Sequence, residues 1–321
     1  MTAPFLREGW ERQLQVVTMI ANPMRYRTRY DLYLAFAARM AHAGVSLSTV
    51  EVAFGDRAFA ITQPDNPHHL QLRTQCALWV KENALNLGVQ RLLPADWQYV
   101  AWIDADVGFV RPDWAEETVH QLQHTPVVQL CSRIADLNPH YESFQTLKSF
   151  GWCLHHEQAY LGQGYVGKRA SWHPGFAWAM RRQTWDALGG LYDRAILGSA
   201  DRYMAHAFIG DVAPFVEGKG FHPALVRSVL AWQDQAASVV RGQVGYVPGL
   251  LYHCWHGSKR NRKYVERWDV LKTHQYDPYR DVTYDAAGVL RFSGNKPGLE
   301  ADCTRYFSQR QEDDVSFEGA G

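Results

Sequence analysis

The sequence has no excess of charge of either sign: 33 lysine and arginine residues balance 33 aspartate and glutamate residues. A protein that coats nucleic acid needs a basic excess, and an intrinsically disordered chain needs low hydrophobicity with high net charge. Neither description fits, because hydrophobic residues make up 46% of the 321 positions. The composition therefore excludes both classes and is typical of a globular protein, while a local basic site stays possible.

The sequence also has few cysteines and no long apolar run. Its five cysteines are widely spaced and never form a CxxC pair, so we expect free thiols in a reducing compartment and no structural zinc site. No apolar stretch reaches the roughly 20 residues that cross a bilayer, and the first fifteen residues lack a basic-then-apolar signal pattern. We therefore expect a cytoplasmic protein without a membrane span.

What the sequence does contain is an alternation of apolar strand patterns with amphipathic helical patterns. Strands are expected at 16–20, 48–54, 98–103 and 127–130, and helices at 31–43, from the Pro64–Pro67 cap to 93, from 112, and at 199–209. This alternation predicts βαβ units, hence an α/β fold with a mostly parallel sheet flanked by helices. Residues 132–171 are expected to form loops with a mobile flap, and the tail from 311 is expected to be frayed.

The strongest chemical motif is Asp104-Ala105-Asp106, which directly follows the apolar strand pattern 98–103. Ligands of open α/β sheets bind beyond the carboxyl ends of the strands. Two carboxylates at such a point suit Mg²⁺ or Mn²⁺, with the phosphates of a ligand completing the coordination. The alternative is a surface turn, because the tripeptide also occurs by chance.

Four motifs in order resemble GT-A fold glycosyltransferases of the galactosyltransferase and polypeptide N-acetylgalactosaminyltransferase type, including those of bacteria and phages. They are Lys81–Gly88 with Tyr99–Asp106, then His173–Arg182, then Trp185–Asp193 with Gly198–Asp201, and finally Tyr252–Gly257 with Asn261, Arg262 and Tyr264. The resemblance covers about residues 14–280. It implies one large Rossmann-like domain, with a nucleotide-sugar half at 1–131, an acceptor half at 132–256 and an extension with a frayed tail at 257–321.

The resemblance also implies roles for individual residues. Asp104 and Asp106 would bind the metal, with His256 as third ligand and His253 as the competing choice, and Asp201 would be the general base of an inverting enzyme. The family often has Glu-Asp where this chain has Ala200-Asp201, so the stereochemical outcome stays open. Contacts to a nucleotide-diphosphate sugar, with a UDP-sugar expected, are implied for Asn22, Arg25, Asp56, Lys81, Asn86, Asp104, Trp172, Gly175 and Arg262.

Physical arguments support these roles but leave simpler alternatives. Basic residues at 259–263 would add positive charge near a departing diphosphate, and Trp172, Trp178 and Trp185 suit the apolar faces of sugars. However, each tryptophan is also a candidate core residue, Asp201 is a candidate helix cap, and the two histidines are candidates for buried hydrogen bonding. The Gly162–Gly167 segment matches G-x-G-x-x-G without a following helix start, which favours a flap over a dinucleotide site.

The sequence therefore predicts a metal-dependent glycosyltransferase in a bacterial or phage-infected cytoplasm. Its partners would be a nucleotide sugar and a hydroxyl acceptor, either a glycan or a hydroxymethylated pyrimidine in phage DNA. Two other functions stay open. One is a metal-dependent hydrolase of nucleotide sugars or phosphodiesters, and the other is a non-catalytic carbohydrate- or DNA-binding protein on the same scaffold.

Overall fold

The computed structural model describes residues 13–158 and 172–317. The helices are α2 (Arg27–His42), α3 (Lys81–Leu92), α4 (Trp114–His124), α5 (Phe150–His156), α6 (Arg182–Leu188), α7 (Ala200–Phe208), α8 (Ala213–Val216), α9 (Pro223–Val240), α10 (Arg267–Thr273) and α11 (Pro297–Gln309). The strands are β1 (Leu14–Ala21), β2 (Ser46–Phe54), β3 (His69–Thr74), β4 (Tyr99–Ile103), β5 (Val107–Phe109), β6 (Val127–Gln129), β7 (Arg133–Leu137), β8 (Ser143–Ser149), β9 (Trp172–His173), β10 (Ala177–Arg181), β11 (Val244–Tyr246), β12 (Leu250–His253), β13 (Val282–Tyr284) and β14 (Leu290–Phe292).

The central sheet of the described chain has the strand order β11-β6-β10-β4-β1-β2-β3. Strands β4, β1, β2 and β3 run parallel, as the βαβ pattern predicts, whereas β10 is antiparallel to both of its neighbours. Because β10 lies between β4 and β6, the chain after residue 131 completes the sheet that the first 130 residues begin. The predicted α/β fold with a mostly parallel sheet is therefore confirmed.

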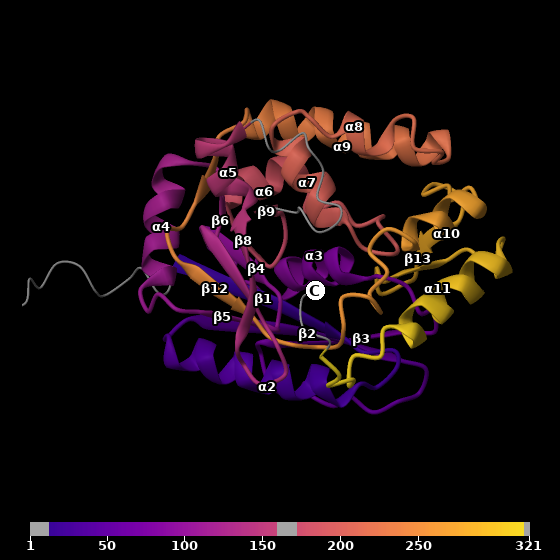
Figure 1. Cartoon of the computed structure of the whole chain (residues 1–321), viewed down its shortest axis with the longest axis horizontal. Helices are drawn as coiled ribbons and strands as arrows, with labels where there is room; N and C mark the ends of the chain where they lie inside the picture. The colour runs from indigo at the N-terminus through magenta and orange to yellow at the C-terminus, as the bar shows by residue number, and fades with distance from the viewer. Residues whose placement is uncertain (1–12, 159–171, 318–321) are drawn as a thin grey trace, which may run out of the picture.

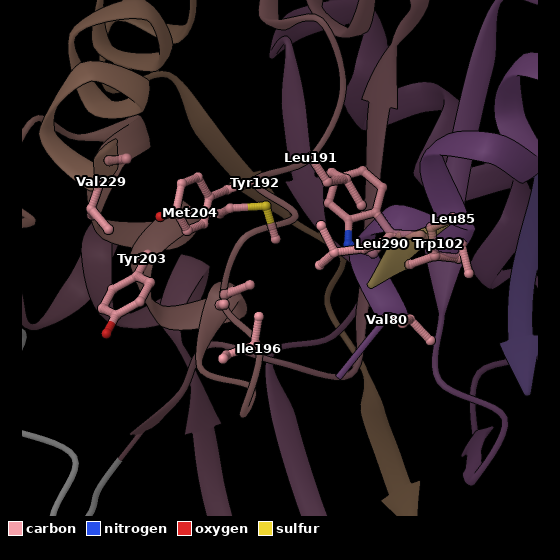
Figure 2. Close-up of a cluster of buried hydrophobic side chains, with 14 of the residues drawn as sticks. Val80, Leu85, Trp102, Leu191, Tyr192, Ile196, Tyr203, Met204, Val229 and Leu290 are labelled. Atoms are coloured by element: carbon pink, nitrogen blue, oxygen red, sulfur yellow. The ribbon is translucent and has the colours of Figure 1, made fainter. Parts of the chain in front are cut away.

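Helices cover both faces of this sheet (Figure 1). Helices α2 and α4 pack on one face, where Phe36, Met40 and Val119 are fully or almost fully buried. Helices α3, α7 and α9 lie over the other face (Figure 1). Figure 2 shows part of this larger core, with Trp102 of β4 among the side chains of Leu85, Leu191 and Leu290.

A smaller sheet, with the order β5-β12-β7-β8-β9, lies beside the carboxyl end of β4. The chain passes from β4 through the Asp104–Asp106 segment directly into β5, so the candidate metal motif connects the two sheets. This junction fixes where the site can form.

Two expectations about local structure are wrong. The helix expected from the Pro64–Pro67 cap is a helix only from Lys81, because residues 69–74 instead pair with β2 as strand β3. Residues 132–158 are not loops but form β7, β8 and α5. In residues 69–74 polar and apolar residues alternate, and strand pairing uses that alternation better than a helix does.

The tail is also better ordered than expected. The carboxylate of Glu312 is 1% exposed and pairs with Arg29 and Arg310. Asp313 accepts hydrogen bonds from the backbone N–H groups of Arg27 and Thr28 at 3.0 and 2.8 Å, at the start of α2. The prediction of a frayed tail is therefore wrong for residues 311–317. In the described residues, no helix combines the length and the apolar character that crossing a membrane requires.

Candidate functional site

A cavity of about 180 Å³ opens where the parallel strands β1 and β4 end. Its walls come from the segments that follow these strands, from the first turn of α3, from the loop after β12 and from the tail. Sequence-predicted site residues that line it are Asn22, Lys81, Asp104, Asp106, Asp201, His253, His256 and Arg262. The cavity lies where ligands of α/β sheets bind.

One wall holds the histidine cluster, which we define as Asp106, His253 and His256. Strand β12 pairs with β5 so that His253 lies opposite Val107, the residue after Asp106. The backbone N–H of Cys254 donates to the carbonyl oxygen of Asp106 at 2.8 Å. The ligand-type atoms of the three side chains all lie within 4.8 Å of one another.

The geometry of the histidine cluster fits a divalent metal ion. Asp106 Oδ2 is 3.1 Å from His256 Nε2, and His253 Nε2 is 3.2 Å from the same atom. Neighbouring ligand atoms on a small octahedral cation, with bonds of about 2.1 Å, are about 3.0 Å apart. Asp106 Oδ1 and His256 Nδ1 are buried and have no hydrogen-bond partner in the described parts of the chain. Two imidazoles in the donor set favour a transition metal such as Mn²⁺ over Mg²⁺, which prefers oxygen.

Burial keeps His256 in the neutral form that can bind a metal ion. Burial and the nearby charge of Arg262 lower the pKa of His256 to about 3. The imidazole is therefore neutral at pH 7, as coordination requires.

Asp104, the first carboxylate of the motif, points to a different partner. It forms an ion pair with Lys81, in the first turn of α3, and does not belong to the histidine cluster. Burial alone would lower the pKa of Lys81, but the charges of Asp104 and Glu82 outweigh it and raise that pKa. Lys81 is therefore a fixed cation on the cavity wall.

Glu82 is a cavity residue that sequence patterns did not indicate. It is buried beside Lys81, and burial raises the pKa of its carboxyl group to about 8. A carboxylic acid at the start of an amphipathic helix resembles an ordinary exposed residue in sequence. Only the packing of α3 against the cavity distinguishes it.

The wall beside the histidine cluster holds the arginine cluster, which we define as Arg29, Arg262, Arg267, Arg310 and Glu312, all of which line the cavity. Arg262 is 4% exposed and donates to the hydroxyl of Tyr264 at 2.9 Å. Arg267 is also buried and donates to Ser199 Oγ at 2.7 Å. The Nε atoms of both are buried without a hydrogen-bond partner among the described residues. Neither guanidinium forms an ion pair with a carboxylate in this part of the molecule, which is unusual for buried charges.

Glu312 compensates the other two arginines of this cluster. Its carboxylate accepts a hydrogen bond from Arg29 Nη2 at 2.7 Å and also pairs with Arg310. Burial opposes ionisation of Glu312, but the charges of Arg29 and Arg310 outweigh it and hold its pKa well below the usual range. Sequence patterns did not indicate Glu312, Arg267 or Arg310, because nothing in the local sequence shows that the tail returns to α2.

Asp201 lies in the first turn of α7 and faces the cavity. The N-cap position is occupied by Ser199, whose side chain makes no cap hydrogen bond, whereas Asp201 Oδ1 accepts from the backbone N–H of Arg202 at 2.8 Å, so Asp201 satisfies one N–H group at this helix start. Gly175 is required beside it, because a Cβ at that position would lie 2.6 Å from Asp201 Oδ2. The close approach of the Gly175 backbone brings Asp201 and His173 to the same part of the wall.

Some predicted donor contacts lie elsewhere. Arg25 and Asp56 are exposed and do not line the cavity. Asn86 uses its side-chain amide on the backbone of Leu191, with hydrogen bonds of 2.8 and 3.0 Å. Asn22 lines the cavity, but its amide bonds the backbone of Tyr26 at 2.7 and 2.9 Å.

The tryptophans expected to form a sugar cleft are core residues. Trp172 is 1% exposed and packs against Phe150 and His206, and Trp178 and Trp185 are buried as well. None of the three lines the cavity. The prediction that they stack on a sugar is wrong, because apolar burial under α7 and α9 stabilises them more than an open wall would.

The basic run 259–263 is also used differently from the prediction. Only Arg262 lines the cavity. Lys259 pairs with Asp136 at 2.5 Å, Lys263 donates to Gln309 at 2.7 Å, and Arg260 is exposed. The predicted flap at Gly162–Gly167 lies outside the described residues.

No protein-family model matches the sequence, and no curated protein matches it. Among solved structures, the fold is similar to a Drosophila β-1,4-galactosyltransferase 7 mutant in complex with manganese, UDP-Gal and xylobiose (11% identity, 91% of this chain, 98% of that chain, TM-score 0.42). A second similar structure is a putative nucleotide-diphospho-sugar transferase from Desulfovibrio desulfuricans (11% identity, 93% of this chain, 98% of that chain, TM-score 0.34). A third is mannosyl-3-phosphoglycerate synthase from Rubrobacter xylanophilus (12% identity, 89% of this chain, 88% of that chain, TM-score 0.37). Similarities of this size do not assign the chain to a family.

Proposed function

We propose that the protein is a metal-dependent glycosyltransferase that moves a sugar from a nucleotide-diphosphate donor, a UDP-sugar, to a hydroxyl acceptor. One observation carries the proposal. A single cavity at the strand ends combines a metal-type cluster of Asp106, His253 and His256 with two buried arginines that lack carboxylate partners in the described chain. A metal diphosphate is the ligand that would complete both walls at once.

In this proposal each wall has a distinct task. Asp106, His253 and His256 would hold Mn²⁺, which as a Lewis acid stabilises the charge that develops on the leaving diphosphate. Arg262 and Arg267 would donate hydrogen bonds to phosphate oxygens and so satisfy their own buried N–H groups. Asp104 and Lys81 would contact the nucleoside side of the donor. The donor contacts of this proposal therefore extend beyond the expected donor half at residues 1–131, because His253 and His256 lie in the expected acceptor half at 132–256.

Asp201 is the proposed general base. Its carboxylate faces the cavity from a different element than the metal-type cluster. In this proposal the acceptor hydroxyl enters between them. An ionised carboxylate within hydrogen-bond reach takes the proton of the hydroxyl as it attacks, which typically contributes about 10²–10⁴ in rate. Direct attack of this kind inverts the configuration at the transferred carbon.

For the acceptor we propose a glycan rather than modified DNA. Two of the basic residues that could contact a phosphate backbone are engaged within the protein, Arg29 with Glu312 and Lys259 with Asp136, which leaves the exposed Arg25 and Arg260. So few available cations would release few DNA counterions. Transfer to a glycan hydroxyl needs no basic surface.

The decisive experiment is a calorimetric titration of UDP-sugars with and without Mn²⁺, followed by product analysis with a panel of glycan acceptors. We expect binding that requires Mn²⁺, and transfer that requires an acceptor. No donor binding in the presence of Mn²⁺ would refute the proposal. Free sugar released at full rate without acceptor would indicate a hydrolase instead. Turnover that needs Fe²⁺ and consumes O₂ would indicate oxygenase chemistry, because the same donor set holds Fe²⁺ in oxygenases.

A further inference from the structure

A buried carboxylate outside the cavity, Asp136, contacts the histidine cluster from behind. It lies near the end of β7 and is 2% exposed. Its Oδ1 is 2.6 Å from His253 Nδ1, and its Oδ2 accepts from Lys259 Nζ at 2.5 Å. Asp136 does not line the cavity and takes no part in the function proposed above.

The backbone register fixes this contact. Strand β7 lies between β8 and β12, and it pairs Asp136 with Gln145 on one side and with His253 on the other. Gln145, Asp136 and His253 are therefore neighbours in one row across three strands. Lys259 donates to Gln145 Oε1 at 2.5 Å as well as to Asp136, so it joins the first two members of the row.

The contact decides which nitrogen of His253 is free. An ionised carboxylate only accepts hydrogen bonds, so His253 Nδ1 must carry the proton that it donates to Asp136. In the neutral ring Nε2 then has the lone pair, and Nε2 is the atom that faces His256 at 3.2 Å. Without this acceptor, the ring could protonate at either nitrogen and rotate.

Lys259 extends the effect to the second histidine. It lies three residues after His256, in the loop that follows β12, and its ammonium group is held by Asp136. One carboxylate is thus bonded to one histidine of the cluster and to the loop that carries the other. A charge buried to this degree is costly unless it is paired on both sides, and here it is.

We propose that Asp136 is the positioning residue of the metal site. It holds His253 with Nε2 directed at the metal position and, through Lys259, anchors the loop after His256. The inference rests on the proposed function only in assuming that the histidine cluster binds a metal. Partners of this kind typically change metal affinity by about 10–100-fold when they are removed.

The chain contains a matched control. Asp302 accepts from His274 Nε2 at 2.8 Å, and this pair lies outside the cavity. Asp302→Asn makes the same chemical change as Asp136→Asn, at a carboxylate–histidine pair that is not part of the histidine cluster.

The test measures Mn²⁺ binding by electron paramagnetic resonance of the free ion, and the His253 tautomer by ¹⁵N NMR of the metal-free protein. We expect Asp136→Ala to weaken Mn²⁺ binding about 10–100-fold and to mix the tautomers of His253. Asp136→Asn keeps an acceptor oxygen and should retain part of the affinity, and Lys259→Met should have a smaller effect than Asp136→Ala. Asp302→Asn should leave both readouts unchanged.

Two results would overturn the inference: Mn²⁺ affinity in folded Asp136→Ala equal to that of the natural chain, or a His253 tautomer that does not respond to the substitution. If Asp136→Ala does not fold, Asp136→Asn and Lys259→Met decide in the same two measurements. If the natural chain binds no Mn²⁺, the proposed function fails, and the tautomer alone decides whether Asp136 positions His253.

Discussion

The two walls of the cavity are built by different means. In the histidine cluster, backbone ladders fix His253, because β12 pairs with β5 and β7 and so places His253 beside Val107 and Asp136. The arginine cluster is assembled from α2, the loop after β12, α10 and the tail, and side-chain contacts hold it together. A ladder positions a ligand atom through several hydrogen bonds at once, whereas a side-chain contact does so through one or two. Substitutions in the first wall should therefore reduce metal binding and the rate of sugar transfer. Substitutions in the second wall should reduce the free energy of unfolding or the affinity for the nucleotide.

The largest effect is expected from the ladder-built wall. Asp106→Asn replaces a charged ligand without changing the strands around it, so the fold should persist while Mn²⁺ binding is lost. Because a Lewis acid supplies several kcal/mol to such reactions, sugar transfer should fall by about 10³-fold. Initial rates and Mn²⁺ titration measure the two effects. Unchanged Mn²⁺ affinity in this variant would remove Asp106 from the metal site.

The next effect concerns the stability of the second wall. Glu312→Ala leaves Arg29 and Arg310 without their buried carboxylate, which should lower the free energy of unfolding by about 3–5 kcal/mol. The neighbouring Asp313→Ala is a control, since it removes only the hydrogen bonds at the start of α2 and should cost about 1 kcal/mol. Urea denaturation compares them. Equal losses of unfolding free energy in the two variants would mean that buried Glu312 stabilises the fold no more than Asp313 does at the start of α2.

A smaller effect, on affinity alone, separates the two walls directly. Arg267→Met removes charge-assisted hydrogen bonds worth about 1.5–3 kcal/mol, so UDP affinity should fall about 10–100-fold. Mn²⁺ affinity without nucleotide should not change. Arg260→Met, an exposed arginine near the same loop, serves as the control. Calorimetry that finds equal UDP binding in the Arg267 and Arg260 variants would contradict the role of the arginine cluster.

The smallest effect, counted per pH unit, is a pH dependence that originates outside both walls. His206 is fully buried, and burial lowers its pKa to about 3. Between that value and 6.5 the unfolded chain binds a proton that the folded chain does not, so stability decreases as the pH falls through this range. The contribution is about 1.4 kcal/mol per pH unit.

His206→Phe should reduce the slope of the unfolding free energy against pH by this amount. The prediction concerns this slope and not the absolute stability near pH 8. Denaturation at a series of pH values between 4 and 7 measures the slope. An unchanged slope would show that His206 is protonated in the folded protein.

How much the sequence could predict also differs between the walls. The strand before Asp104-Ala105-Asp106 and the His253/His256 pair were recognisable, because a ladder-built site leaves apolar runs beside its ligands. Asp136 carried a weaker signal of the same kind, an acidic residue ending the run Ile134-Ala135. Glu312 and Arg267 carried none, since their burial depends on which distant segments meet. The prediction that the tryptophans line a sugar cleft failed for the same reason. The composition shows that the chain has many aromatic side chains, but not whether they lie in the core or on a cavity wall.

The contact between Arg29 and Glu312 spans 283 positions of the chain. Closing so long a loop costs entropy before the contact returns any energy, so such contacts form late in folding. Strands β1 and β2, in contrast, are neighbours in sequence and in the sheet. We therefore expect the sheet to form before the cavity has its second wall, and the tail to be the first segment whose amide hydrogens exchange with solvent. The molecule would pass through a state that is already folded but has no pocket to bind a donor.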